Sequence, residues 1–176
     1  MPLFAPRTSA GIAGHLKYLF RREDDMTHDD PWKPPDLRVG EGHDTHRIIA
    51  ARSLIVGGIH ITDADFGLDG HSDADVLLHA VIDALLGATA QGDIGEWFPD
   101  TGDEWKNADS TELLDTVLRS VLKRGWRIIN LDCTIHAEKP RMTLWKPKIR
   151  QRLAELLKLS ADVVNIKAKS GEKVGP

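Results

Sequence analysis

His71-Ser-Asp-Ala-Asp-Val-Leu-Leu-His79, continued by Ala80-Val-Ile-Asp-Ala-Leu-Leu-Gly-Ala-Thr89, is the stretch that decides the fold. Its apolar residues recur at helical spacing, which predicts a helix over Asp73–Thr89. Ser72 or Asp73 is expected to cap the N-terminus of this helix. Because the helix is almost entirely apolar, its few polar residues are the first candidates for a functional role.

The rest of the chain from residue 37 predicts further strands and helices around this helix. We expect a strand over Leu37–Gly42, a strand with a glycine kink over Ser53–Ile61, a polar loop over Asp63–Gly70, a long loop over Ala90–Ala108, a helix from a capping Asp109 to about Arg124, a strand over Trp126–Ala137, a helix that begins at Pro147, a last strand over Val163–Lys169 and a turn over Gly171–Pro176. This order predicts the α/β (α+β) class, as a two-layer sandwich with helices on one face of a mixed sheet.

The composition excludes several classes of protein. Hydrophobic residues make up 41% and charged residues 28% of the 176 residues, which is ordinary for one globular domain. The net charge of -4 gives no basic surface for a nucleic-acid partner, and no apolar run is as long as a membrane span. Cys133 is the only cysteine, so an internal disulfide and a cysteine-based zinc site are both excluded.

The first 36 residues differ in composition from the rest. They begin with a basic stretch without acids, followed by an acidic stretch and prolines, and no periodic pattern persists. We therefore expect residues 1–36 to be a disordered N-terminal extension and residues 37–176 to be the domain. The alternative is a transit peptide, which would place the protein in a plastid instead of the cytoplasm.

A metal site is predicted from Asp44, His46 and His79. In a strand, residues i and i+2 point to the same face, so Asp44 and His46 can reach one point together. By itself, His79 would usually be a surface or core histidine. However, Asp75 and Asp83 lie one helical turn away on either side, and either carboxylate could orient the ring. One carboxylate, two imidazoles and an open fourth position are typical of a catalytic zinc.

Four other segments carry weaker signals. His71 lies in a loop beside this site and could stabilise developing negative charge, whereas capping alone would explain Ser72. The long loop, with residues 92–95 and 98–102, is either functional or a pair of tight turns. Residues 138–141 suit an anion, and Ser170-Gly-Glu172 could hold a hard cation with phosphate oxygens.

Taken jointly, five motifs resemble one family. Gly-x-Gly-x-Asp-x-His, His-Ser-Asp-x-Asp-x-x-x-His, Asp-Ala-Leu-Leu-Gly-Ala, Gly-Asp-Ile-Gly and Phe-Pro-Asp occur in that order within about residues 37–176. The chain resembles 2-C-methyl-D-erythritol 2,4-cyclodiphosphate synthases of the non-mevalonate isoprenoid pathway. The resemblance implies a phosphorus–oxygen lyase that releases CMP from 4-diphosphocytidyl-2-C-methyl-D-erythritol 2-phosphate and forms the cyclic diphosphate. It also implies a ferredoxin-like fold with a four-stranded sheet, and a homotrimer with active sites between subunits.

The resemblance also implies roles for individual residues. Zinc would be held by Asp44, His46 and His79, and a second divalent cation, Mg²⁺ or Mn²⁺, by Glu172. His71 and Ser170 match the positions that stabilise the transition state. The implied substrate-binding residues are Asp44, His46, His71, Ser72, Asp93, Ile94, Gly95, Phe98, Pro99, Asp100, Thr101, Gly102, Ala137, Glu138, Lys139, Pro140, Arg141, Met142, Thr143, Lys169, Ser170, Gly171 and Glu172.

Two departures and two alternatives accompany this prediction. Many members carry several hydroxyls before the last Glu, whereas here the run Lys169-Ser-Gly-Glu172 leaves only Ser170. The family normally continues beyond the position of Pro176 with one more strand, so we expect a sheet without that strand and an impaired trimer and activity. The alternative functions are a zinc-dependent phosphoesterase, in which zinc activates water, and a degenerate zinc-binding module without catalysis.

Overall fold

The computed structural model of the chain describes residues 37–50, 52–101, 105 and 107–173. The predicted extension, residues 1–36, lies outside the described residues. All described helices and strands belong to the unit Arg38–Pro176. They are β1 (Ile48–Ala50), β2 (Ile55–Val56), β3 (Ile59–His60), β4 (Phe66–Leu68), α2 (Val76–Ala88), α3 (Ile94–Trp97), α4 (Ser110–Lys123), β5 (Leu131–His136), α5 (Lys146–Leu157) and β6 (Val164–Lys169), with short 3₁₀ turns over Met142–Leu144, Ala161–Val163 and Gly171–Lys173.

The predicted central helix is confirmed as α2, although it begins later than expected. Asp75, not Ser72 or Asp73, is its N-cap, because an oxygen of Asp75 accepts from the backbone N–H of Leu77 and Leu78, each at 3.1 Å. The same carboxylate accepts from the backbone N–H of Gly57 at 2.8 Å and of Gly58 at 2.6 Å. Asp75 is completely buried and therefore joins the start of α2 to the β2–β3 turn.

The prediction of one strand over Ser53–Ile61 is wrong in one respect, because this segment forms a hairpin of two strands. Gly57 and Gly58 both have positive φ, +63° and +71°, and connect the antiparallel β2 and β3. Two consecutive residues with positive φ form the tight turn that reverses a strand, so the glycine pair ends one strand and begins another.

Two more predictions in this half of the chain are corrected. Residues 37–47 form no strand, and the loop predicted over Asp63–Gly70 contains β4, which pairs with β1 in antiparallel fashion. Similarly, the long loop contains the short helix α3. A short strand in which apolar and polar residues alternate only weakly forms only where another strand pairs with it. The tertiary fold decides which strand that is.

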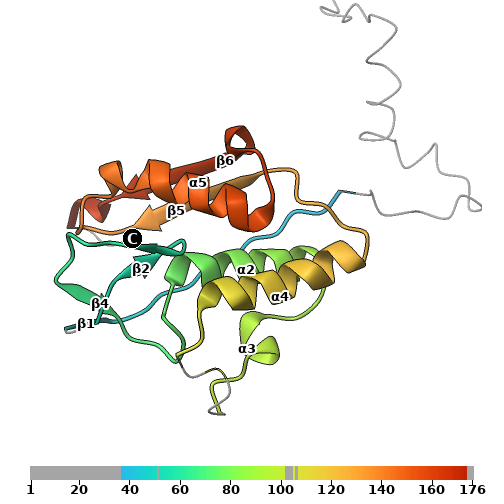
Figure 1. Cartoon of the computed structure of the whole chain (residues 1–176), viewed down its shortest axis with the longest axis horizontal. Helices are drawn as coiled ribbons and strands as arrows, with labels where there is room; N and C mark the ends of the chain where they lie inside the picture. The colour runs from blue at the N-terminus through green and yellow to red at the C-terminus, as the bar shows by residue number, and fades with distance from the viewer. Residues whose placement is uncertain (1–36, 51, 102–104, 106, 174–176) are drawn as a thin grey trace, which may run out of the picture. The chain divides into compact units, whose positions relative to one another are not determined.

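The α/β class is confirmed, with the strands divided among three small sheets. Figure 1 shows α5 in front of β5 and β6, with α2 and α4 running side by side below them. β5 and β6 are parallel over six residue pairs from Leu131↔Val164 to His136↔Lys169. In the described part of the chain, β1–β4, β2–β3 and β5–β6 are separate two-stranded sheets, not the single four-stranded sheet that was expected.

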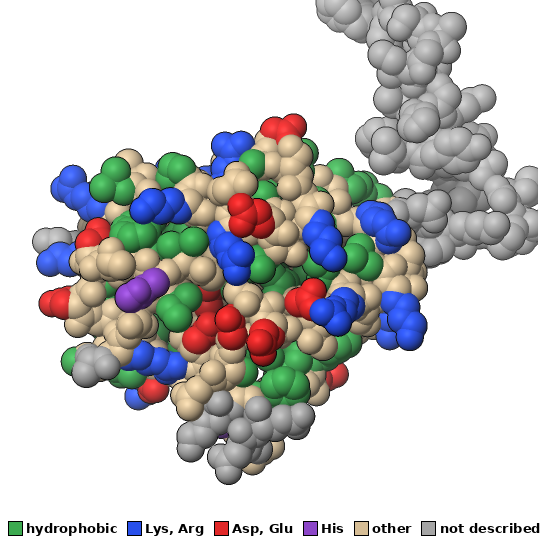
Figure 2. All heavy atoms as spheres, in the orientation of Figure 1, with side chains coloured by type: hydrophobic (Ala, Val, Ile, Leu, Met, Phe, Trp, Pro, Cys, Tyr) green, Lys and Arg blue, Asp and Glu red, His purple; other side chains and the backbone are tan. Residues whose placement is uncertain are grey.

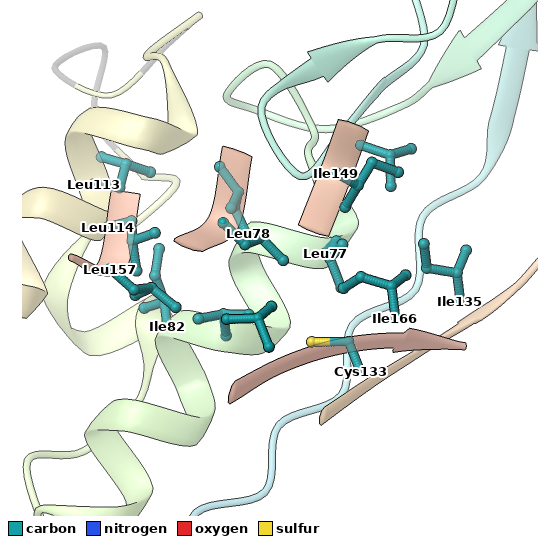
Figure 3. Close-up of a cluster of buried hydrophobic side chains, with 14 of the residues drawn as sticks. Leu77, Leu78, Ile82, Leu113, Leu114, Cys133, Ile135, Ile149, Leu157 and Ile166 are labelled. Atoms are coloured by element: carbon teal, nitrogen blue, oxygen red, sulfur yellow. The ribbon is translucent and has the colours of Figure 1, made fainter. Parts of the chain in front are cut away.

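The core lies where α2, α4 and α5 meet β5 and β6. Figure 3 shows Leu78 and Ile82 of α2 facing Leu114 of α4 and Leu157 of α5, with Cys133 and Ile166 on the strands. On the face drawn in Figure 2, side chains of both charges are interspersed with hydrophobic ones. None of the described helices is both long and apolar enough to cross a bilayer.

Candidate metal centre

Asp44, His46 and His79 come together as predicted. Asp44 Oδ2 lies 2.9 Å from His46 Nε2 and 3.0 Å from His79 Nδ1, and the two nitrogens are 3.2 Å apart. Four ligands at about 2.0 Å in a tetrahedron would be separated by about 3.3 Å, so these three atoms fit one zinc-sized ion. The side chains are 11–23% exposed, which leaves the cluster open on one side.

Two glycines bring the first two ligands to the helix that carries the third. An added Cβ at Gly40 would lie 1.9 Å from the carbonyl oxygen of Ala84, and one at Gly42 would lie 2.0 Å from that of Ala80. The segment before Asp44 therefore packs directly on the backbone of α2, next to His79. This contact explains why Asp44 and His46 meet His79 although residues 37–47 form no strand.

The loop between β4 and α2 supports the imidazole of His46. The backbone of Asp69 forms a hydrogen bond with His46. A Cβ added to Gly70 would lie 3.1 Å from Cε1 of the same ring. The Arg52 guanidinium donates to the carbonyl oxygens of Gly70, at 2.9 Å, and of Ser72, which holds this loop in place.

The second nitrogen of His79 contacts serines, not the carboxylates that were predicted. Its Nε2 lies 2.9 Å from Ser110 Oγ and 3.1 Å from Ser72 Oγ. Asp75 is occupied by four backbone donors, and Asp83 accepts from the backbone N–H of Ile94 at 2.8 Å. Sequence reasoning missed Ser110, since its position beside the capping Asp109 indicated only a helix start.

The electrostatics of the cluster favour an anionic Asp44 beside its histidines. Burial alone would raise the pKa of Asp44, but its hydrogen bonds to His46 and His79 lower it below the usual range. The bond to Asp44 raises the pKa of His46, against the opposing effect of burial. A carboxylate that stays ionised and two imidazoles are suitable ligands for a divalent cation that acts as a Lewis acid.

The predicted residues of the long loop have mainly structural contacts. Asp93 caps α3 by accepting from the N–H of Glu96 at 2.9 Å, and Ile94 and Gly95 belong to that helix. Phe98 is buried and meets Trp105 edge to face at 5.0 Å between ring centroids. Pro99, Asp100 and Thr101 follow it, and Gly102 lies outside the described residues. His71 precedes α2, and its carbonyl accepts from the N–H of Asn107 at 2.8 Å.

The other predicted residues gather at one edge of the β5–β6 pair. The strands are parallel, so their carboxyl ends meet, and the N–H of Ala137 donates to Lys169 O at 2.9 Å. Beyond this bond lie Glu138 to Thr143, with a cis peptide before Pro140, and Ser170 to Glu172. Ser170 Oγ lies 3.3 Å from Glu172 Oε1. The bond between Ala137 and Lys169 therefore places the starts of these two segments side by side.

The fold and the cluster define a class of protein, namely mixed α/β proteins with a His₂Asp cluster whose ligand atoms are close enough to hold one metal ion. More particularly, the chain belongs to the YgbB family, whose model matches residues 37–176.

Relatives of similar sequence include cyclodiphosphate synthases. This chain is 50% identical over 140 residues to 2-C-methyl-D-erythritol 2,4-cyclodiphosphate synthase from Synechococcus elongatus, a match that covers 80% of this chain and 87% of that protein. The enzyme of the same name from Synechocystis sp. is 49% identical over 140 residues, which is 80% of this chain and 86% of that one.

Solved structures agree with the sequence relatives. A 2C-methyl-D-erythritol-2,4-cyclodiphosphate synthase in a CDP-bound form superposes with a TM-score of 0.73 at 32% identity, over 78% of this chain and 92% of that chain. The CDP complex of IspF from Plasmodium falciparum gives a TM-score of 0.67 at 28% identity, over 78% and 84% of the two chains.

Proposed function

We propose that the chain converts 4-diphosphocytidyl-2-C-methyl-D-erythritol 2-phosphate to 2-C-methyl-D-erythritol 2,4-cyclodiphosphate and CMP. An oxygen of the 2-phosphate attacks the β-phosphorus of the same molecule. A new P–O bond forms, the bond from the β-phosphorus to the bridging oxygen breaks, and CMP leaves with that oxygen. The observation that carries this proposal is the Asp44–His46–His79 cluster in a chain that is 50% identical to synthases of this name.

The residues of the cluster suit zinc. Asp44, His46 and His79 would hold the ion through one carboxylate oxygen and two imidazole nitrogens, the ligand set of an open catalytic zinc site. A zinc ion bound there would supply charge neutralisation at the β-phosphate. Because attacking and leaving groups belong to one substrate, the protein has mainly to orient them and exclude competing water.

The remaining roles are part of the same proposal. His71 and Ser170 would stabilise the transition state, and Glu172 would bind Mg²⁺ or Mn²⁺ at the diphosphate. Residues 137–143 would surround the cytidine, which is supported by the hydrogen bond that joins Ala137 to Lys169, the residue before Ser170. The active sites would lie between the subunits of a homotrimer. The domain boundary at residue 37 and the cytoplasmic location, or a plastid, stay predictions.

Incubation of the protein with the substrate, zinc and magnesium tests the proposal, with mass spectrometry of the products. We expect CMP and the cyclic diphosphate in equal amounts. Orthophosphate would indicate a phosphoesterase instead, and unchanged substrate would indicate a binding module.

Matched histidine variants assign the activity to the cluster. His46→Gln removes one of the three ligands and should abolish product formation. His60→Gln changes an exposed histidine of β3 and should not affect it. Equal activity in the two variants would contradict the role of the cluster.

A further inference from the structure

The Nε2 atom of His79 faces two buried hydroxyls on the side away from Asp44. Ser110, the first residue of α4, is completely buried and places its Oγ 2.9 Å from this nitrogen. Ser110 Oγ in turn donates to Asp73 Oδ1 in a short hydrogen bond. This contact therefore links a ligand of the metal centre to the start of another helix.

The number of protons decides the direction of these bonds. A carboxylate only accepts, so the single hydroxyl proton of Ser110 points to Asp73. The oxygen of Ser110 then presents only lone pairs to His79, which requires a proton on Nε2. Ser72 does not reverse this order, because its Oγ accepts from the N–H of Ala74 at 3.1 Å and its own proton can point to Ser110, 3.4 Å away.

Asp73 is itself held in place. Its Oδ2 accepts from the backbone N–H of Ser110, and its Oδ1 from that of Asp75, each at 3.2 Å. The backbone N–H of Asp73 also donates to Ala108 O at 3.0 Å. The end of the relay is therefore anchored to the starts of both α2 and α4.

We propose that Ser110 is a positioning residue of the metal centre, which acts with Asp73 as a hydrogen-bond relay that keeps the proton of His79 on Nε2. With Nε2 protonated, Nδ1 is the ring nitrogen whose lone pair would bind an ion, and the ion would replace the hydrogen bond of Nδ1 to Asp44 at 3.0 Å. The relay also fixes the rotation of the ring. This inference rests on the metal centre of the proposed function, and it assigns to α4 a role in metal binding.

The affinity of the Ser110→Ala variant for zinc tests the relay. We expect the dissociation constant for Zn²⁺, measured by competition with a chromogenic chelator, to rise about 10- to 100-fold. Long-range ¹H–¹⁵N correlation of the histidine side chains should show His79 protonated at Nε2 in the wild type, with that proton exchanging faster with solvent in the variant. A general loss of packing would not produce this signature.

Two further variants control for folding. Ser120→Ala removes another hydroxyl of α4, which donates to Gln91 at 2.8 Å, and should leave zinc affinity unchanged. Asp73→Asn keeps the shape of the side chain but removes its charge, and should weaken zinc binding even if Ser110→Ala does not fold.

The outcomes separate the relay from the function it serves. The relay would be overturned if Ser110→Ala bound zinc with wild-type affinity and left the His79 spectrum unchanged. If only Asp73→Asn folds, the same result in that variant would overturn it. A wild-type protein that binds no zinc would overturn the metal chemistry of the proposed function, whereas an unprotonated Nε2 in that protein would overturn the relay.

Discussion

At the scale of single residues, Gly70 is the glycine most closely tied to the metal centre. A Cβ there would lie 2.9 Å from the Cβ of Ala74 and 3.1 Å from the His46 ring. Both distances are shorter than normal carbon contacts, so the ring has to move.

We therefore expect Gly70→Ala to weaken zinc binding while the protein remains folded. Isothermal titration with zinc and far-UV circular dichroism measure the two properties. Gly87→Ala is the matched control, because its Cβ would meet only Glu41 O at 3.9 Å and alanine favours a helix interior. Equal zinc affinity in the two variants would show that His46 tolerates the displacement.

Cys133 provides a prediction about pH. Burial, followed by the nearby charge of Asp132, raises the pKa of this thiol to about 11 from 9.0. Only the thiolate reacts, so at pH 8 its concentration should be about 100-fold lower in the folded protein than in the unfolded one. Alkylation by iodoacetamide, followed by mass spectrometry, should be slow without urea and fast with it. Similar rates in the two conditions would contradict the burial of Cys133.

At the scale of elements, the segment before Asp44 and the helix α2 form one unit. Gly42→Ala would place a Cβ 2.0 Å from Ala80 O and 2.7 Å from Ala84 N, both backbone atoms that cannot rotate away. We expect the segment to separate from α2, which would displace Asp44 and His46 and weaken zinc binding. Zinc titration of Gly42→Ala, with Gly87→Ala as the control, checks this. An unchanged zinc affinity would mean that the positions of Asp44 and His46 do not depend on this contact.

The β2–β3 hairpin and α2 depend on each other through Asp75. Burial raises the pKa of Asp75, while hydrogen bonds from the backbone N–H groups of Gly58, Gly57 and Leu78 stabilise its charged form. In Asp75→Asn, an amide N–H₂ would face N–H donors, which should lower the free energy of unfolding by about 1–3 kcal/mol. Urea denaturation measures the difference. Asp83→Asn retains an acceptor for the single N–H of Ile94 and should lower the free energy of unfolding less. A larger loss of stability in Asp83→Asn than in Asp75→Asn would contradict this account.

At the scale of the whole molecule, large apolar side chains remain at the surface of the single chain. Val39 is 89% exposed and Leu144 77%, and Ile48 and Ile129 are also exposed. Assembly would cover these side chains, so, against the impaired trimer expected from the sequence, light scattering after size-exclusion chromatography should give three times the 19.5 kDa mass of one chain, as in the proposed homotrimer. The mass of a single chain at micromolar concentration would contradict it.

The elements that the sequence predicted well are those with their own strong signals. α2, α4, α5 and β6 have clear periodicity or caps, such as Asp109 before α4 and Pro147 at the start of α5. The predictions missed the short strands β1 and β4, whose few residues carry little periodicity, and took the β2–β3 hairpin for one strand. The pairing of β1 with β4, such as Ile49 opposite Gly67, joins two segments that no local pattern connects.

The sequence by itself determined the candidate ligands Asp44, His46 and His79, because residue type and spacing restrict which side chains can bind a metal. Only the tertiary structure decided how they are supported. The contact of Gly40 and Gly42 with α2, and the bond from His79 to Ser110, join segments with no common local pattern. Local spacing specifies the chemistry of a side chain, whereas its orientation depends on neighbours that packing brings together.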